Sequence, residues 1–180
     1  MLACGMKAIF LFVRNIVDCE SIVVRYRFNE DALLKRIKEE IPEIDGIYQN
    51  INNQFTSMVL GKNSILLFGE GYIIEKLLGY SFRISPSSFY QIHYKQTEKL
   101  YTTAIKMANF KGNEIVLDAY CGIGTIGICL ASLVREVDAV EINKNAIKDA
   151  IDNAKRNNIK NIRFYAEDAK DFMKEKHNEK

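Results

Sequence analysis

Apolar and polar residues alternate with different periods in the two halves of the chain. In the first half, short runs of β-branched and aromatic residues are separated by Gly, Asn and Pro, a pattern that predicts strands. One stretch with helical spacing, residues 29–40, places Leu33, Leu34 and Ile37 on a single face. We therefore expect residues 1–87 to form a partial α+β domain with a mostly antiparallel sheet. Its predicted strands are residues 7–17, 21–28, 46–51, 57–60, 65–68 and 72–74.

Residues 88–180 form the second half, in which apolar strands and amphipathic helices alternate. A long helix is expected over residues 89–109, closed by Gly112. The alternation after it predicts a parallel sheet joined by right-handed crossovers. The expected fold class is α/β, an N-terminal α+β sheet region followed by a Rossmann-like domain. The remaining predicted strands are residues 114–118, 136–141 and 162–165, and the helices are 125–134, 143–157 and one after Asp168.

The composition of the 180 residues sets few limits on function. Apolar residues make up 48%, which is enough for a core and argues against wholesale disorder. Lys and Arg total 25 and Asp and Glu total 23, so the net charge neither requires nor excludes a nucleic-acid partner. The apolar run 8–13 is shorter than the ~20 residues that span a bilayer, so no membrane partner is expected.

Four cysteines favour a reducing, cytoplasmic location over a metal or disulfide framework. No pair has the C-x-x-C spacing of a zinc or iron–sulfur site, so no metal is expected. Reduced thiols in the cytoplasm are the simplest interpretation. The residues concerned are Cys4, Cys19, Cys121 and Cys129.

The sharpest motif is the segment 118–127, Asp-Ala-Tyr-Cys-Gly-Ile-Gly-Thr-Ile-Gly. A predicted strand ends at Asp118, and Gly122 and Gly124 form the turn before a helix. Glycines there let the backbone approach a ligand closely. S-Adenosylmethionine carries a positive sulfonium and no phosphate, so the acids Asp118 and Glu141 suit it better than they suit a dinucleotide.

Three carboxylates lie at the ends of three successive predicted strands. Glu141 is placed to accept the ribose hydroxyls of an adenosine ligand, and Asp168 to accept from the adenine amino group. Each acid alone is more often a surface residue or a helix cap, but Asp118, Glu141 and Asp168 together favour an adenosine site at the carboxyl ends of the strands. A nicotinamide-dependent oxidoreductase stays open here, because residues 122–127 also match G-x-G-x-x-G.

Three segments resemble the RNA 5-methyluridine (uracil-C5) methyltransferases, S-adenosylmethionine-dependent enzymes that act on transfer and ribosomal RNA. The pattern Asp-x-Tyr-Cys-Gly-x-Gly-Thr at 118–125 resembles their first cofactor motif. Residues 82–91, Phe-Arg-Ile-Ser-Pro-Ser-Ser-Phe-Tyr-Gln, are similar to the signature that precedes their Rossmann-like domain. Residues 48–53 with 69–72 resemble their central domain. The resemblance covers residues 44–170 and is greatest to the 23S ribosomal RNA members.

The resemblance implies a set of cofactor contacts. Two alternatives remain for parts of it: Tyr120 could be a core aromatic at a strand end, and residues 85–88 could cap the long helix, with Gln91 merely its exposed first turn. A hydrogen bond from Thr125 is less strongly implied, since some members have Asn there. The implied residues are Gln91, Tyr120, Gly122, Gly124, Thr125, Glu141 and Asp168.

The reaction that the resemblance implies is methyl transfer to C5 of uridine. A cysteine thiolate adds to C6, C5 attacks the methyl group, and a base then removes the C5 proton. In the family the cysteine, the base and an Asp-Pro-Pro-Arg loop follow the third strand, and residues 168–180 contain none of them. We therefore expect a truncated domain that is inactive alone, without a catalytic residue. Cys121 is a poor substitute, because small buried cysteines usually serve packing.

Two further expectations follow. A non-catalytic module that binds S-adenosylmethionine or RNA is the alternative function. In addition, residues 115–118 would form an apolar edge strand, a known aggregation hazard, so we expect low stability or self-association through that edge.

Overall fold

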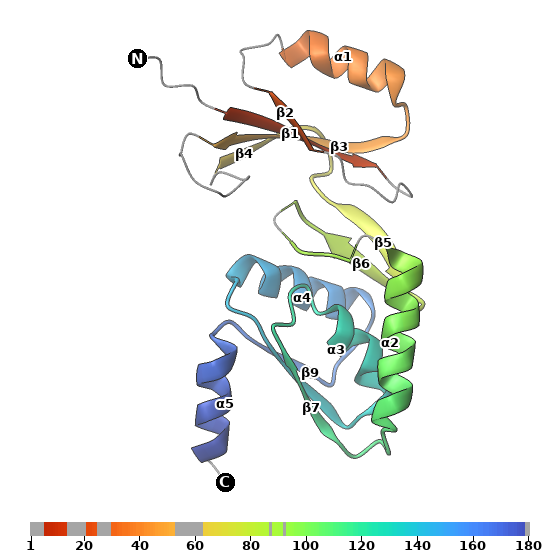
Figure 1. Cartoon of the computed structure of the whole chain (residues 1–180), viewed down its shortest axis with the longest axis vertical. Coiled ribbons are helices and arrows are strands. Elements are labelled where there is room, and N and C mark those ends of the chain that lie inside the picture. The colour runs from red at the N-terminus through yellow and green to blue at the C-terminus, as the bar shows by residue number, and fades with distance from the viewer. Residues whose placement is uncertain are drawn as a thin grey trace. The chain divides into compact units, whose positions relative to one another are not determined.

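A computed structural model describes residues 6–13, 21–24, 30–52, 63–86, 88–91 and 93–178 (Figure 1). The chain divides into two compact units, Met1–Ile73 and Ile74–Lys180, here called the first and the second unit. In the described part of the chain, no helix combines the length and the apolar character needed to cross a bilayer.

The first unit contains a four-stranded sheet in the order β2-β1-β3-β4. Every pairing in it is antiparallel, as predicted, with Lys7 opposite Val24 and Ile47 opposite Phe68. Its elements are β1 (Met6–Val13), β2 (Ser21–Val24), α1 (Glu30–Glu40), β3 (Ile44–Asn52) and β4 (Asn63–Gly69). The strand predicted over 57–60 lies outside the described residues.

Helix α1 packs its apolar face on this sheet. Leu33, Leu34 and Ile37 lie against the buried side chains of Ile44 and Ile47, so the face predicted from helical spacing is confirmed. The packing explains how the first unit forms a core: one amphipathic helix covers one face of the sheet.

A hairpin and a helix precede the parallel sheet of the second unit. Strands β5 (Ile73–Leu77) and β6 (Tyr80–Ile84) are joined by Leu78 and Gly79, which both have positive φ, as two-residue hairpins favour. The N–H of Leu78 donates to Glu98 in α2 (Tyr94–Ala108) at 3.1 Å. Helix α2 begins later than predicted.

The late start of α2 has a local cause. His93 is its N-cap: the His93 side chain accepts from the N–H of Gln96 at 3.4 Å, and its carbonyl accepts from Thr97. Phe89, which the helical spacing had included, is 77% exposed in the irregular segment before the helix. The alternative that residues 85–88 cap this helix is therefore wrong.

The parallel sheet has the strand order β7-β8-β9, and the prediction of parallel pairing is confirmed. Ala119, Val140 and Tyr165 are aligned, so all three strands end at one edge of the sheet. The elements are β7 (Ile115–Ala119), α3 (Thr125–Leu130), the 3-10 helix η1 (Ala131–Leu133), β8 (Glu136–Val140), α4 (Lys144–Arg156), β9 (Ile162–Tyr165) and α5 (Ala169–Asn178).

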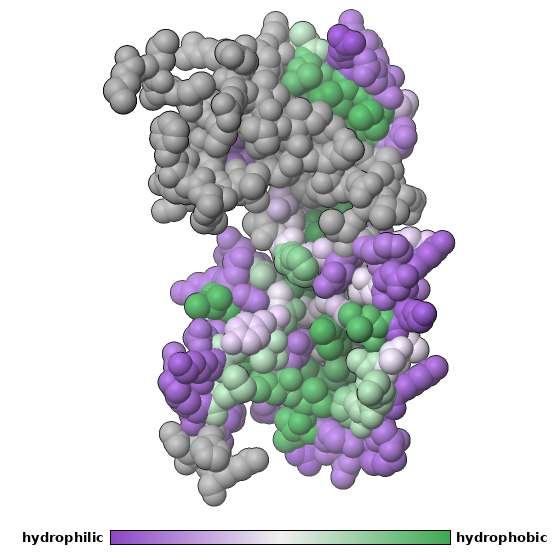
Figure 2. Space-filling model, viewed as in Figure 1, coloured by the Kyte–Doolittle hydropathy of each residue, from purple (hydrophilic) through white to green (hydrophobic). Residues whose placement is uncertain are grey.

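The two faces of this sheet are covered unequally. On one face, here called the covered face, side chains of all three strands pack beneath α2, α3 and α4; they are Val116, Val137, Ala139, Ile162 and Phe164. On the other, the half-covered face, Phe172 of α5 packs against Val140 and Tyr165, whereas Ile115 and Leu117 are exposed. Figure 2 shows hydrophobic residues gathered over the face of the second unit that carries β7.

Candidate functional site

The loop between β7 and α3 is a tight turn built by positive φ angles. Tyr120 (62°), Gly122 (55°) and Gly124 (81°) all adopt left-handed backbone conformations. The φ of Gly124 favours glycine, and a Cβ there would also lie in tight contact, 3.3 Å from the Cβ of Ala150. A Cβ on Gly122 would meet no described atom within 4 Å, so open space lies beside the loop.

Asp118 ties β7 to the first turn of α3. Its buried Oδ2 accepts the N–H of Gly127 at 2.9 Å, and a Cβ on Gly127 would lie 3.1 Å from that oxygen. Burial raises the pKa of Asp118 to about 6, against the lowering effect of the Gly127 hydrogen bond. The Asp118 carboxylate thus accepts a hydrogen bond from the helix N–H that a phosphate would need as a donor.

Glu141 is oriented by two backbone amides at the end of β8. Its Oε2 accepts from the N–H of Gly122 at 3.2 Å, and its Oε1 accepts from the N–H of Asn143 at 2.8 Å. The Glu141 N–H donates to Tyr165 at 3.0 Å, which aligns the ends of β8 and β9. Each carboxylate oxygen retains acceptor capacity for a further donor.

The other predicted residues lie around this edge in different states. Tyr120 is 68% exposed, so the alternative of a core aromatic is wrong. Thr125 is 3.1 Å from Tyr101, hydroxyl to hydroxyl. Asp168 caps α5: its Oδ1 accepts from the N–H of Lys170 at 2.8 Å and more weakly from Asp171. Of the seven predicted residues, Gly122 and Glu141 are joined by a direct hydrogen bond.

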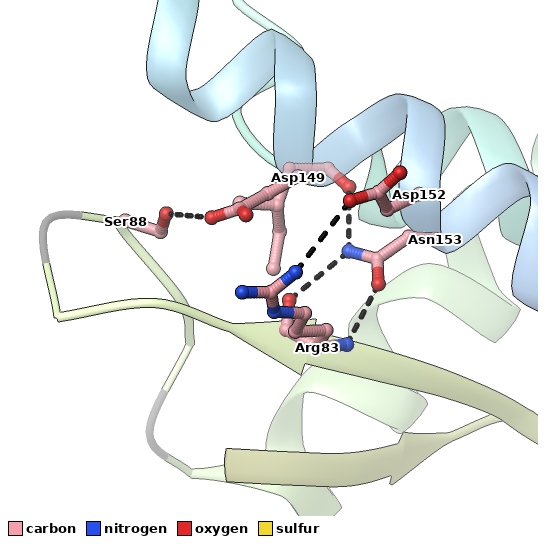
Figure 3. A network of polar contacts seen from close by, with 6 residues as sticks. Arg83, Ser88, Asp149, Asp152 and Asn153 are labelled. Carbon is pink, nitrogen blue, oxygen red and sulfur yellow. Dashed lines mark hydrogen bonds and ion pairs between the residues drawn. The ribbon is translucent and has the colours of Figure 1, made fainter. Parts of the chain in front are cut away.

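Gln91 is exposed in the irregular segment between β6 and α2. This segment is anchored through Ser88, whose hydroxyl donates to Oδ2 of Asp149 in α4 at 2.8 Å (Figure 3). No contact within the described residues joins the Gln91 side chain to Glu141. Its role at the cofactor site therefore remains a prediction.

Sequence reasoning missed the polar network on α4. Asn153 exchanges two hydrogen bonds with the backbone of Arg83, and the Arg83 guanidinium lies 3.5 Å from Asp152 (Figure 3). A signal was available in the sequence, since Asp149 and Asn153 fall on the apolar face of α4 beside Ala150. A polar residue on such a face needs a buried partner.

The two cysteines of the second unit, Cys121 and Cys129, are buried free thiols. Burial, and then the negative charges of Asp118 and Glu141, raise the pKa of the Cys121 thiol. Burial likewise raises the pKa of Cys129 to about 12. A nucleophilic cysteine needs a thiolate, so neither side chain is suited to attack a nucleobase, and both are buried in the core. Cys4 and Cys19 lie outside the described residues.

Metal chemistry finds no support in the described part of the chain. Within it, no group of three or more His, Cys, Asp or Glu side chains could hold an ion. His93 is exposed at the start of α2, and the side chain of His177 is outside the described residues.

Comparison with known sequences gives consistent matches. A profile of the family described as tRNA (Uracil-5-)-methyltransferase matches residues 26–180. An uncharacterized RNA methyltransferase of Staphylococcus epidermidis is 46% identical over 143 residues, which cover 79% of this chain and 31% of that protein. One from Staphylococcus aureus is 44% identical over 144 residues, 80% of this chain and 32% of that protein. The chain therefore spans about a third of the length of these curated relatives.

Solved structures share the fold. The tRNA (uracil-54, C5)-methyltransferase of Pyrococcus abyssi, in complex with S-adenosyl-L-homocysteine, gives a TM-score of 0.54 at 18% identity, over 91% of this chain and 55% of that one. Trm5b from Pyrococcus abyssi gives 0.55 at 23% identity, over 75% and 40%. The likeness at these identities concerns the fold, and it confirms the predicted α/β class with a Rossmann-like parallel sheet.

Proposed function

The chain belongs to the tRNA (uracil-5-)-methyltransferase family, and on that premise we propose that its second unit binds S-adenosylmethionine at the carboxyl edge of β7, β8 and β9. Glu141 would accept the ribose hydroxyls and Asp168 the adenine amino group, with Tyr120 packing on the cofactor and Gln91 contacting it. Gly122 and Gly124 shape the loop, and Thr125 would supply a hydrogen bond. The bound cofactor would supply the methyl group.

The orientation of Glu141 carries this proposal. Two backbone amides, of Gly122 and Asn143, hold its carboxylate beside the glycine loop, and open space lies next to Gly122. A carboxylate held in this way can accept hydrogen bonds from two neighbouring hydroxyls without changing its orientation. The fit to an adenosine ligand rests on this geometry.

Asp118 favours a sulfonium over a pyrophosphate. Its carboxylate already accepts the Gly127 N–H in the first turn of α3, where a dinucleotide would place a phosphate. A phosphate there would meet a carboxylate in competition for the same donor. This contact weighs against the nicotinamide-dependent oxidoreductase.

A titration with Glu141 variants tests the cofactor site. We expect calorimetry to detect binding of S-adenosylmethionine and its product S-adenosylhomocysteine, but not of NADH. Glu141→Ala should weaken binding about tenfold or more, because hydrogen bonds to a charged group contribute about 1.5–3 kcal/mol. Glu175→Gln is the matched control, since it neutralises an exposed acid on α5. Preferential binding of NADH, or equal affinities of the two variants, would contradict the proposal.

We further propose that the full activity is methyl transfer to C5 of uridine in RNA, with 23S ribosomal RNA as the narrower target and transfer RNA as the competing one. The family description and the RNA methyltransferase relatives support an RNA substrate. Buried free thiols at Cys121 and Cys129 support action in the cytoplasm. Methyl-labelled cofactor, offered with each RNA and followed by nucleoside mass spectrometry, decides between the targets.

For the 180 residues by themselves we propose cofactor binding without turnover. Neither Cys121 nor Cys129 offers a thiolate near neutral pH, because burial raises the pKa of both. Methyl incorporation into RNA by the purified chain would overturn this point. If the chain binds the cofactor but transfers no methyl group with any partner added, the alternative, a non-catalytic module, is favoured instead.

We also propose that the chain self-associates through β7. This strand pairs with β8 alone among the described strands, and Ile115 (50% exposed) and Leu117 (39% exposed) leave its face apolar. Sedimentation of the unmodified chain should show concentration-dependent association, which Leu117→Lys should weaken. A monomer at all concentrations, with a sharp melt independent of concentration, would refute it.

A further inference from the structure

Two asparagines, Asn153 in α4 and Asn157 at the C-cap of that helix, hold the backbone of β6 in the way that a neighbouring strand would. Asn157 accepts the N–H of Ser81 and donates to its carbonyl, both at 2.8 Å. Asn153 accepts the N–H of Arg83 at 2.7 Å and donates to its carbonyl at 3.1 Å (Figure 3). Two residues of a strand span about 6.6 Å and four residues of a helix about 6 Å, so the two spacings match.

Asn153 makes one contact that Asn157 does not. Its side-chain Nδ2 also donates to the carbonyl of Ile123 at 3.3 Å, in a fully buried position. Ile123 lies between Gly122 and Gly124, the two glycines with positive φ in the loop after β7. One primary amide therefore joins β6 to the glycine loop.

The same face of α4 touches both chain segments that carry proposed cofactor residues. Ala150 lies against Gly124 of the loop, whose Cβ would sit 3.3 Å away. Asp149 accepts the hydroxyl of Ser88, three residues before Gln91 (Figure 3). Because Asn153 on this face also contacts Ile123 of the loop, α4 is the common support of both segments.

We propose that Asn153 is a positioning residue for the cofactor site: by holding the Ile123 carbonyl and the Arg83 backbone with one amide, it fixes the shape of the glycine loop. Only the expected effect on cofactor affinity rests on the proposed function, and the effect on the shape of the loop does not. Two glycines make the loop adaptable, and a buried bond to the residue between them removes that freedom.

Matched variants at the two asparagines separate loop positioning from the support of β6. Asn153→Ala and Asn157→Ala each delete the bonds to one β6 residue, and Asn157→Ala also deletes a bond to the Asn153 carbonyl. Only Asn153→Ala frees the Ile123 carbonyl. Asn153→Asp and Asn157→Asp repeat the comparison with the acceptor retained and the donor removed. Neither pair changes a residue proposed to touch the cofactor.

Hydrogen exchange of the ligand-free protein is the first readout. The amides of Gly122 and Gly124 donate to Glu141 and Cys121, respectively, so their exchange reports the loop directly. We expect Asn153→Ala to speed their exchange about tenfold and the Asn157 variants by less than about twofold, since one lost hydrogen bond corresponds to roughly a tenfold change. Equal effects of both pairs, or an unchanged loop in Asn153→Ala, would overturn the proposal.

Affinity for S-adenosylhomocysteine is the second readout, and it separates this inference from the cofactor proposal. Asn153→Ala should weaken binding about tenfold, and the Asn157 variants should leave it nearly unchanged. If the unmodified chain binds no S-adenosylhomocysteine while loop exchange still responds to Asn153 alone, the cofactor proposal fails and the role of Asn153 in shaping the loop stands.

A measurement on the unmodified chain covers the case in which Asn153 variants do not fold. The side-chain amide protons of Asn153 should exchange slowly, and their NMR signals should move when S-adenosylhomocysteine is added, because they bond to the loop. Those of Asn157 should stay in place. Identical responses of the two side chains, or none at Asn153 in a chain that binds the ligand, would refute the proposal.

Discussion

The covered and half-covered faces of the parallel sheet use their buried polar groups differently. On the covered side, Asp118 bonds to the backbone of Gly127, and Asn153 of α4 bonds to backbone groups of Arg83 and Ile123. These side chains fix where the main chain runs. Bonds of this kind cannot be replaced by repacking, because the backbone groups they satisfy would stay buried.

On the half-covered face, polar side chains bond to one another. Arg163 and Tyr165 both donate to Oδ1 of Asp138, at 2.9 Å and 3.2 Å, and Arg163 also pairs with Glu136. Among the described residues, the side-chain bonds of Asp138, Arg163 and Tyr165 do not reach the main chain. The comparison teaches that the face that positions the candidate site is the one where side chains constrain backbone, and the following tests probe that difference.

The largest expected difference concerns apolar truncation on the two faces. Ile147→Ala on α4 removes a buried side chain that packs beneath the covered face, and should lower the free energy of unfolding by about 2–5 kcal/mol. Ile115→Ala is the matched control on the half-covered face, where the side chain is 50% exposed, and should cost less than about 1 kcal/mol. Urea unfolding of both variants measures it, and similar losses would show that Ile115 is buried in solution.

The second prediction concerns the pH dependence that Asp118 imposes. Its pKa is about 6 in the folded chain and near 4 when unfolded, so the folded state retains a proton between these values that the unfolded state has released. Stability should therefore fall as the pH rises from about 4 to about 6, by about 2–3 kcal/mol.

Asp118→Asn tests this directly, because an amide oxygen can still accept the Gly127 N–H but does not titrate. We expect the free energy of unfolding of this variant not to fall in that range. Its stability relative to the unmodified chain should therefore increase as the pH rises from about 4 to 7. Parallel curves for the two proteins would mean that Asp118 titrates normally. Denaturant unfolding at several pH values supplies the measurement.

The smallest effect is expected on the half-covered face. Tyr165→Phe removes one hydroxyl bond to Asp138 and leaves the ring on Phe172, so it should cost about 0.5–1.5 kcal/mol. The bond from Arg163 still satisfies the same carboxylate oxygen. A loss as large as that of Ile147→Ala would show that side-chain bonds on this face hold the backbone after all.

Local patterns were sufficient to predict the three parallel strands and the edge that they share. Acids at the ends of apolar strands put Asp118 and Glu141 near one edge, since parallel strands end together. The bond from Gly122 to Glu141 then brings the predicted glycine loop and the predicted acid into contact. These features depend on periodicity and chain order, which a sequence contains.

Strand β6 and its support could not be read in the same way. Its hairpin turns at Leu78 and Gly79, and this Leu-Gly pair lacks the Asn-Gly or Asp-Gly signature that is usual for such turns. The bonds that hold it join residues 70 and 76 positions apart in the sequence, from Asn153 to Arg83 and from Asn157 to Ser81. A side chain that bonds to distant backbone leaves no periodic trace, so only its polarity on an apolar helix face hinted at a partner.

The spacing of two asparagines along the helix matches the spacing of the two β6 residues that they bind. Ser81 and Arg83 present their N–H and C=O groups to the helix because they are two residues apart, and Asn153 and Asn157 meet them because they are four apart. Inserting one residue between Ser81 and Arg83 would turn the N–H and C=O groups of Arg83 to the opposite edge of the hairpin. A change of length between Ser81 and Arg83 would therefore break the match with Asn153 and Asn157.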